Sequence, residues 1–131
     1  MPCPYIAQFK AFIEAAYGLP VVVGTVENVF QESAKSARSL DEVVAFATKA
    51  GVDAVMPYIR QIAERGQASI TVGLYQGVTE PAALRALAKA RKELSGRLKI
   101  NVATTPNLHR KVYVFRFPKS TTVLVGSAAR W

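Results

Sequence analysis

Hydrophobic and polar positions along this chain follow two different periods, and segments of the two kinds alternate. Apolar residues recur every three or four positions in four segments, as in amphipathic helices: 4–17, 25–38, 52–63 and 79–94. Between them stand short runs rich in apolar and β-branched residues, as in buried strands: 19–24, 43–47, 69–74 and 98–103. The pattern therefore predicts helices and strands in regular alternation.

Residues that begin and end secondary structure stand at the borders of these segments. Gly18 and Pro20 end the first helical segment, and Thr25 is placed to cap the second. The third has Asp53 as a candidate N-cap and ends at Gly66. The fourth opens with Thr79-Glu80-Pro81 and stops at Gly96. Pro57 lies within the third segment, where we expect it in the first turn or at a kink.

The last third of the chain predicts a β-hairpin. Residues 110–117 and 122–125 have the character of two strands, joined around Pro118-Lys119-Ser120. Alternating strands and helices followed by a hairpin predict an α/β fold with a mixed β-sheet flanked by helices. The hairpin is expected at the edge of the sheet or as the part that bears the site. At 131 residues we expect a single domain spanning 1–131, with an N-terminal helix at 4–17 and a core from about 19 to 131.

Composition narrows the setting of this domain. No apolar run approaches the roughly 18 residues needed to cross a bilayer, so no membrane association is expected. The N-terminus lacks the pattern of a signal peptide, which predicts a cytoplasmic location. Cys3 is the one cysteine and has no partner for a disulfide. With one cysteine and one histidine, neither a metal site nor a cofactor is expected.

The net charge of +8 is concentrated in the second half of the chain. Residues 1–65 hold six Lys and Arg against seven acidic residues, whereas residues 66–131 hold eleven against two. Such an excess is commonly only a solvated basic face. Here it surrounds the chain's candidate chemistry, which favours a polyanionic partner such as nucleic acid.

That chemistry centres on His109, the one histidine in the sequence. Side chains two apart on a strand share a face, so His109 and Lys111 would form a His-x-Lys pair. Gly126-Ser127 adds a turn with short hydrogen-bond donors. An imidazole, a cation for phosphate oxygens and nearby donors suit the handling of a phosphodiester. A lone histidine is also commonly a surface or packing residue, and that alternative stays open.

These residues and their order resemble the phospholipase D superfamily, in its nuclease-like branch of single-motif nucleases and metal-independent restriction endonucleases. The resemblance runs from about Ala34 to Ser127. Its signature is similar to His109-Arg110-Lys111-Val112-Tyr113-Val114-Phe115 followed by Val125-Gly126-Ser127-Ala128. Upstream, Val44-Ala45-Phe46-Ala47 with Gly51-Val52 looks like the family's first core strand and helix, and 77–84 looks like its next unit.

The resemblance implies a phospholipase D-like fold and a role for each matching residue. His109 would be nucleophile or general acid, forming a phosphohistidine, with Lys111 as phosphate clamp and Ser127 as a supporting donor. Arg110, Arg116 and Gly126 would contact the substrate, DNA rather than RNA. Neither metal nor cofactor would be required. Because the chain has one motif, a complete site would need a homodimer in which two His109 residues meet across a two-fold axis.

The sequence departs from the family pattern at three places. Arg116 stands where the motif usually has aspartate, and Ala129 stands where it has asparagine. The chain stops at Trp131, whereas relatives continue, so we expect a fold shortened at its C-terminus. A fragment of a longer protein and a shortened protein with impaired chemistry both fit this pattern.

Three functions follow as hypotheses. The first is a metal-independent, dimeric phosphodiesterase that acts as an endonuclease on DNA. The second is a catalytically degenerate or truncated member that binds nucleic acid or partner subunits without cleaving. The third is a phospholipid-processing enzyme, which the lack of an interfacial amphipathic helix or aromatic belt disfavours.

Overall fold

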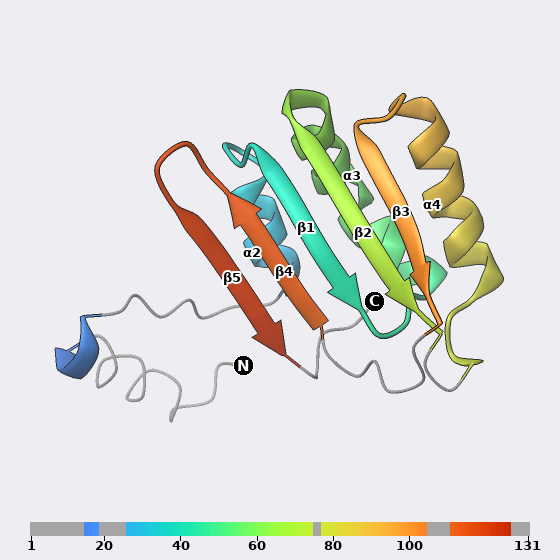
Figure 1. Ribbon diagram of the computed structural model, residues 1–131, viewed down its shortest axis with the longest axis horizontal. Coiled ribbons are helices and arrows are strands. Elements are labelled where there is room, and N and C mark those ends of the chain that lie inside the picture. Colours follow the sequence, from blue (N-terminus) through green and yellow to red (C-terminus); the bar gives the residue numbers. More distant parts are fainter. Residues whose placement is uncertain (1–14, 19–25, 75–76, 105–110, 127–131) are drawn as a thin grey trace.

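Five strands and three helices make up the fold in a computed structural model of the chain, which describes residues 15–18, 26–74, 77–104 and 111–126 (Figure 1). The elements in chain order are α2 (Val26–Ser33), β1 (Ser39–Val44), α3 (Lys49–Arg65), β2 (Gln67–Gly73), α4 (Pro81–Glu93), β3 (Leu98–Ala103), β4 (Lys111–Arg116) and β5 (Thr121–Gly126). The sheet order is β3-β2-β1-β4-β5. Strands β1, β2 and β3 are parallel, whereas β4 is antiparallel to β1 and to β5. The predicted α/β fold with a mixed sheet is confirmed.

The three helices cover one face of the sheet and enclose the core (Figure 1). In β1 and β2 alternate residues are buried against the helices, and in β2 these residues are apolar. Phe30 of α2 packs edge to face on two aromatic residues of β4. Its ring centroid lies 5.6 Å from that of Tyr113 and 5.2 Å from that of Phe115. These contacts fix the hairpin to the helical layer.

Helix α3 begins earlier than its sequence pattern predicted. Thr48 is the N-cap and accepts a hydrogen bond from the Gly51 N–H at 3.1 Å, so the expectation that Asp53 caps this helix was wrong. Asp53 instead pairs with Lys49 one turn away. Pro57 lies in the helix interior, not in its first turn. The apolar stripe of α3 begins at Val52. The first turn, Lys49–Gly51, precedes this stripe and is stabilised by the Thr48 cap rather than by burial.

Two further boundaries differ from prediction. Helix α2 ends at Ser33, five residues before the expected end at Arg38, and a turn leads into β1. Strand β1 spans Ser39–Val44, not 43–47, because the chain turns away after Val44 to start α3. Strands β2 and β3, helix α4 and the hairpin lie within a residue or two of their predicted positions. The helix predicted at 4–17 and the strand predicted at 19–24 fall largely or wholly outside the described residues.

A glycine allows β1 and β2 to start side by side. A Cβ built at Gly66 would lie 1.8 Å from the Arg38 carbonyl oxygen, so no side chain fits there without moving the backbone. Gln67 donates its N–H to the same carbonyl at 3.3 Å. Gly66 thus ends α3 and brings the chain into register with β1 in a single residue.

The other face of the sheet is not covered by any helix in the described part of the chain. It carries partly exposed residues of the central strands, among them Asp41, Val43, Ser69 and Thr71. At its border β5 exposes Val123 and Val125 to 55% and 66%. The sheet is therefore buried on one side and open on the other within the described residues.

Candidate functional site

Two halves of the predicted site signature meet at one edge of the sheet. Lys111 begins β4 and Gly126 ends β5, and the two residues are directly opposite in the ladder that joins the strands. Because β4 is antiparallel to β1, this is also the edge where β1, β2 and β3 reach their carboxyl ends (Figure 1). Open α/β sheets bind ligands at the carboxyl ends of their parallel strands. We call this region the carboxyl edge.

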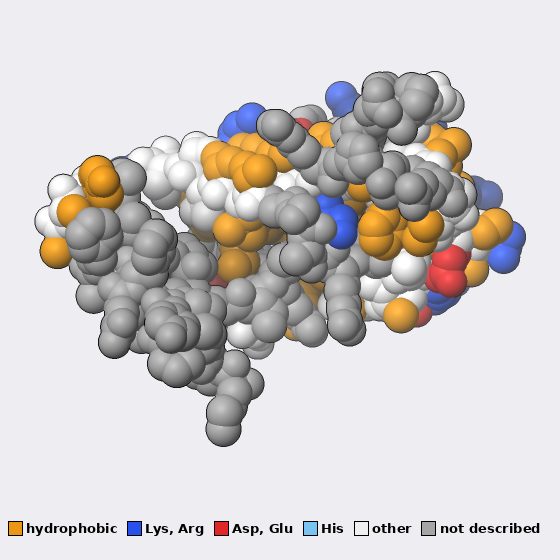
Figure 2. Space-filling model, turned by 90° about the horizontal axis from the view of Figure 1, so that it is seen from below, with side chains coloured by type: hydrophobic (Ala, Val, Ile, Leu, Met, Phe, Trp, Pro, Cys, Tyr) orange, Lys and Arg blue, Asp and Glu red, His pale blue; other side chains and the backbone are white. Residues whose placement is uncertain are grey.

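Figure 2 views the molecule toward this edge. Hydrophobic side chains gather on this face, with Lys and Arg side chains among them and at its margin. The remaining residues predicted to act here, His109, Arg110 and Ser127, lie outside the described residues. In the sequence they directly adjoin the ends of β4 and β5.

Lys111 is turned into the protein rather than toward solvent. Its side chain is 3% exposed, and its Nζ lies 4.6 Å from the centroid of the Phe46 ring. A cation over an aromatic face is attracted by the ring quadrupole. Burial lowers the pKa of the Lys111 amine, because the charged form loses its hydration. A lysine in this state gives up its proton more readily than one on the surface.

Glu42 is a buried acid that sequence reasoning missed. It lies on β1 opposite Tyr113 in the ladder, on the same sheet face as Lys111, and its side chain is 2% exposed. Neither carboxyl oxygen has a hydrogen-bond partner among the described residues. Burial raises the pKa of the Glu42 carboxyl well above its usual value. Such a carboxyl keeps its proton to higher pH than an exposed one.

The pKa shifts of Glu42 and Lys111 both favour the uncharged form. In each case the cause is desolvation by burial. The inner face of β1 and β4 therefore places two ionisable groups in a region built from apolar side chains. No signal in the sequence separates Glu42 from its neighbour Asp41, because only the pleat decides which of the two points inward.

Arg116 is not brought together with Lys111 and Gly126. It ends β4, five residues beyond Lys111, which corresponds to about 17 Å along a strand. Its guanidinium forms an ion pair with Asp41, on the open face of the sheet. There it borders a hollow of about 250 Å³ that also includes Arg97 and Lys99. This hollow is at the opposite edge, where β1 and β2 begin.

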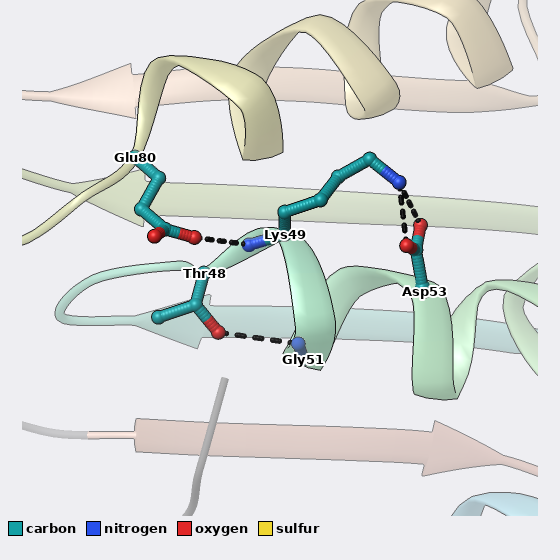
Figure 3. A network of polar contacts seen from close by, with 5 residues as sticks. All are labelled: Thr48, Lys49, Gly51, Asp53 and Glu80. Carbon is teal, nitrogen blue, oxygen red and sulfur yellow. Dashed lines mark hydrogen bonds and ion pairs between the residues drawn. The ribbon is translucent and has the colours of Figure 1, made fainter.

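The loops at the carboxyl edge are held by hydrogen bonds between their backbones and side chains. Lys49 donates its backbone N–H to Glu80 Oε1 at 2.6 Å (Figure 3), and the Glu80 N–H donates to the Ala47 carbonyl at 2.9 Å. The Thr79 hydroxyl donates to the Gly73 carbonyl at 2.7 Å and accepts from the Ala47 N–H at 3.2 Å. The start of α3 is thereby fixed to the start of α4.

This network also occupies the N-terminus of α3. The Glu80 carboxylate and the Thr48 hydroxyl accept two of the N–H groups at the helix start (Figure 3). A helix N-terminus attracts anions through these groups and the helix dipole. Because the protein's own carboxylate already takes that position, the α3 terminus is not open to a phosphate.

A groove lies between α3 and α4 on the outer side of the helical layer. Its volume is about 480 Å³, and its cations and acids come from both helices: Lys49, Asp53 and Arg60 from α3, and Arg85, Lys89 and Glu93 from α4. Arg60 and Glu93 join the two helices through an ion pair at 2.5 Å. Val52, Met56, Ala82 and Ala86 supply its apolar lining. Both helices start at the carboxyl edge, so the groove begins there too.

No group of three or more His, Cys, Asp or Glu side chains comes together among the described residues in a way that could hold a metal ion. No described helix is both long and apolar enough to cross a membrane.

Comparison with known proteins gives a likeness in fold alone. No protein-family model matches the sequence, and no curated protein matches it either. The structure is similar to the crystal structure of polyphosphate kinase from Porphyromonas gingivalis, with a TM-score of 0.52 and 15% sequence identity. The similarity covers 72% of this chain but only 16% of the kinase chain. This chain therefore corresponds to a small part of that larger protein.

Proposed function

We propose that this chain is a phospholipase D-like phosphodiesterase domain that cleaves DNA through His109. One observation carries the proposal. Lys111 and Gly126, which are 15 residues apart in sequence, are paired in the ladder at the carboxyl edge. The two halves of the His-x-Lys and Gly-Ser pattern thus start from a common point in the fold. The fold likeness to an enzyme named as a polyphosphate kinase supports a phosphoryl-transfer chemistry.

In the proposed reaction His109 acts as the nucleophile. One of its ring nitrogens attacks phosphorus, the bond from phosphorus to the leaving oxygen breaks, and a phosphohistidine forms. The leaving oxygen takes a proton from His109 of the partner subunit. Water then attacks the phosphohistidine, returns the free imidazole and gives its proton back to the partner's His109. Lys111 and the Ser127 hydroxyl would stabilise charge on the phosphate oxygens during both steps.

The experiment compares the chain with its His109→Ala variant on plasmid and single-stranded DNA in excess EDTA. We expect EDTA-resistant cleavage by the chain and none by the variant. Circular dichroism of the variant checks that its fold is intact. Cleavage that His109→Ala leaves unchanged, or that EDTA abolishes, would overturn the proposal.

A second candidate function is binding of nucleic acid without cleavage. It is favoured by the position of Lys111, whose amine is buried over Phe46 and not presented to solvent. Ala129, at the place of the family asparagine, points the same way. Under this alternative neither protein cleaves DNA, and both bind it with an affinity that falls steeply as salt rises.

A further inference from the structure

The groove between α3 and α4 holds more positive than negative charge. Four cationic side chains border it, and two of them are matched by carboxylates: Lys49 by Asp53, and Arg60 by Glu93. Within the described residues the other two, Arg85 and Lys89, have no carboxylate partner. The groove therefore keeps two cations that no carboxylate of the described residues neutralises.

The spacing of these two cations carries a cost for the helix. Arg85 and Lys89 are four residues apart on α4, so they lie one turn apart on the same side. Like charges at this spacing destabilise a helix. An anion placed between the two side chains would relieve their repulsion.

The direction of the groove links these cations to the carboxyl edge. Helices α3 and α4 each follow a parallel strand and so start at that edge (Figure 1). Figure 3 shows the same end of the groove, where Lys49 turns along α3 toward Asp53. An extended chain of phosphates that leaves the candidate site can follow the groove past Arg85 and then Lys89.

The second basic hollow, on the open face of the sheet, is a weaker candidate. Its Arg116 is already neutralised by Asp41, and its Arg97 donates to the Glu64 carbonyl at 2.8 Å. It also lies at the edge of the sheet away from Lys111 and Gly126. Of its three cationic side chains, only that of Lys99 has no polar partner among the described residues.

We propose that the groove between α3 and α4 binds the phosphodiester backbone of a nucleic acid strand, with Arg85 and Lys89 as its phosphate contacts. This inference rests on the proposed function for the identity of the polyanion. It goes beyond that function because it assigns binding to residues outside the His-x-Lys signature. The acidic side chains of the groove, Asp53 and Glu93, keep Lys49 and Arg60 in place at its two ends.

The test measures binding rather than cleavage, so it stays separate from the fate of the nuclease proposal. A labelled single-stranded oligonucleotide is titrated with the full chain carrying His109→Ala, over a series of salt concentrations. Three double variants are made in this background, each removing one Arg and one Lys charge. They are Arg85→Gln/Lys89→Gln in the groove, Arg97→Gln/Lys99→Gln in the second hollow, and Arg91→Gln/Lys92→Gln on α4 outside the groove.

We expect only the groove pair to weaken binding strongly. Loss of two phosphate contacts reduces the slope of log affinity against log salt by about 1.4, at roughly 0.7 for each contact to a single strand. The pair on α4 outside the groove should keep the slope of the parent protein, although its change in net charge is identical.

Three results would overturn the inference. The groove pair could behave like the pair outside the groove, or the pair in the second hollow could account for the loss of slope. Inorganic polyphosphate could also bind the parent protein while the oligonucleotide does not. That last result would keep a chain of phosphates as the ligand but would refute a nucleic acid. Whether the unmodified chain cleaves DNA is measured independently of these binding results. The proposal of cleavage through His109 and the proposal of binding in the groove can therefore be refuted separately.

Discussion

At the scale of single residues, the buried pair of ionisable side chains on β1 and β4 is the least expected feature of the protein. Glu42 and Lys111 lie on the face that the helices cover, in positions where an apolar side chain would pack without cost. The Glu42 carboxyl has no hydrogen-bond partner among the described residues, and burying a polar group in that state is unfavourable by about 1–3 kcal/mol on mutational scales. Burial also shifts the pKa of each side chain toward its uncharged form, which makes both residues candidates for function.

Glu42 predicts a specific dependence of stability on pH. Because burial raises its pKa, the folded state keeps this proton where the unfolded chain has lost it. The free energy of unfolding therefore falls as pH rises from the unfolded pKa, about 4.3, toward the raised value. The slope contributed by Glu42 is at most about 1.4 kcal/mol per pH unit.

The substitution Glu42→Gln should remove this loss. We expect the variant to match the original chain in acid and to be increasingly more stable above about pH 5, in urea unfolding measured across pH. Asp41→Asn on the opposite face of β1 is the control for loss of a carboxylate. A constant difference between Glu42→Gln and the original chain at every pH would contradict the interpretation.

Lys111 predicts a separation of stability from activity. The change Lys111→Met keeps an unbranched stem against Phe46 and removes a charge whose burial is unfavourable. We expect a melting temperature no lower than that of the original chain. If Lys111 holds phosphate, DNA cleavage should fall at least about 100-fold, the usual cost of losing one electrostatic contact to the transition state.

Lys99→Met, an exposed lysine on β3, is the matched control and should leave cleavage unchanged. Full activity of Lys111→Met would mean that the buried amine serves packing alone. A variant that fails to fold would show instead that the cation over Phe46 is a structural requirement, which the desolvation of the amine argues against.

At the scale of elements, the sequence correctly predicted the strands and helices in which buried positions are apolar and exposed positions are polar. Strands β2 and β3 are apolar runs, and α4 has Pro81 at its start and an apolar stripe, so pattern and structure coincide. Strand β1 begins four residues before the predicted segment, and its first half contains the charged residues Asp41 and Glu42, which a criterion based on apolar runs does not detect. Only the contacts of β1 with β2 and β4 reveal that it begins at Ser39.

The candidate site was predictable to a similar degree and for the same reason. Alternation along β4 indicates that Lys111, Tyr113 and Phe115 share a face, and the structure confirms it. The two-residue alternation along β4 does not indicate which face of the strand is covered by the helices, because that depends on how the sheet packs. The apolar period of α4 indicates that Arg85 and Lys89 lie on its outward face, but their position beside α3 is a tertiary property.

Helix α3 carries a proline that predicts an easily stabilised element. Pro57 is the ninth residue of the helix, where it lacks the N–H that would bond to the Asp53 carbonyl. A proline inside a helix is about 3 kcal/mol less favourable than alanine, and about 0.4–1 kcal/mol of that is offset by the greater freedom of the unfolded chain. Pro57→Ala should therefore raise the free energy of unfolding by about 2 kcal/mol.

Pro57 is exposed, so its replacement by alanine opens no cavity. The measurement is the midpoint of urea unfolding, which should rise while the m-value stays constant. Ala54→Gly at another exposed position of α3 is the control and should lower stability by about 1 kcal/mol. A destabilised Pro57→Ala variant would show that a bend at this proline is needed for α3 to pack on the sheet.

At the scale of the whole molecule, the arrangement separates where a substrate would react from where it would be held. The carboxyl edge contains the start of β4 and the end of β5, whereas Arg85 and Lys89 lie along the outer groove. The basic second half of the chain supplies both regions, because α4 and the hairpin belong to it. The excess positive charge of the second half of the sequence thus extends from the carboxyl edge into the groove between α3 and α4.

If both the nucleophile and the acid of the proposed reaction are histidines, the single histidine of each chain means that two chains must form the site. This requirement predicts how activity depends on mixing. Differently tagged original and His109→Ala chains are produced together, and DNA cleavage is measured as the fraction of original chain varies. If each site combines two His109 residues, only dimers of two original chains cleave, so activity follows the square of that fraction. An equal mixture should retain about one quarter of full activity at constant total protein, rather than about one half.

The mixing experiment separates the shared site from independent sites, even if the protein is a dimer for other reasons. A linear dependence would show that each chain is complete with one imidazole, and that a different group protonates the leaving oxygen. Glu42 would then be the residue to examine first, since its carboxyl holds a proton above the usual pH range and lies on the same face of the sheet as Lys111. The Glu42→Gln variant, which we expect to be stable, would lose cleavage if Glu42 is the acid. It would keep cleavage if the second histidine of a dimer is the acid.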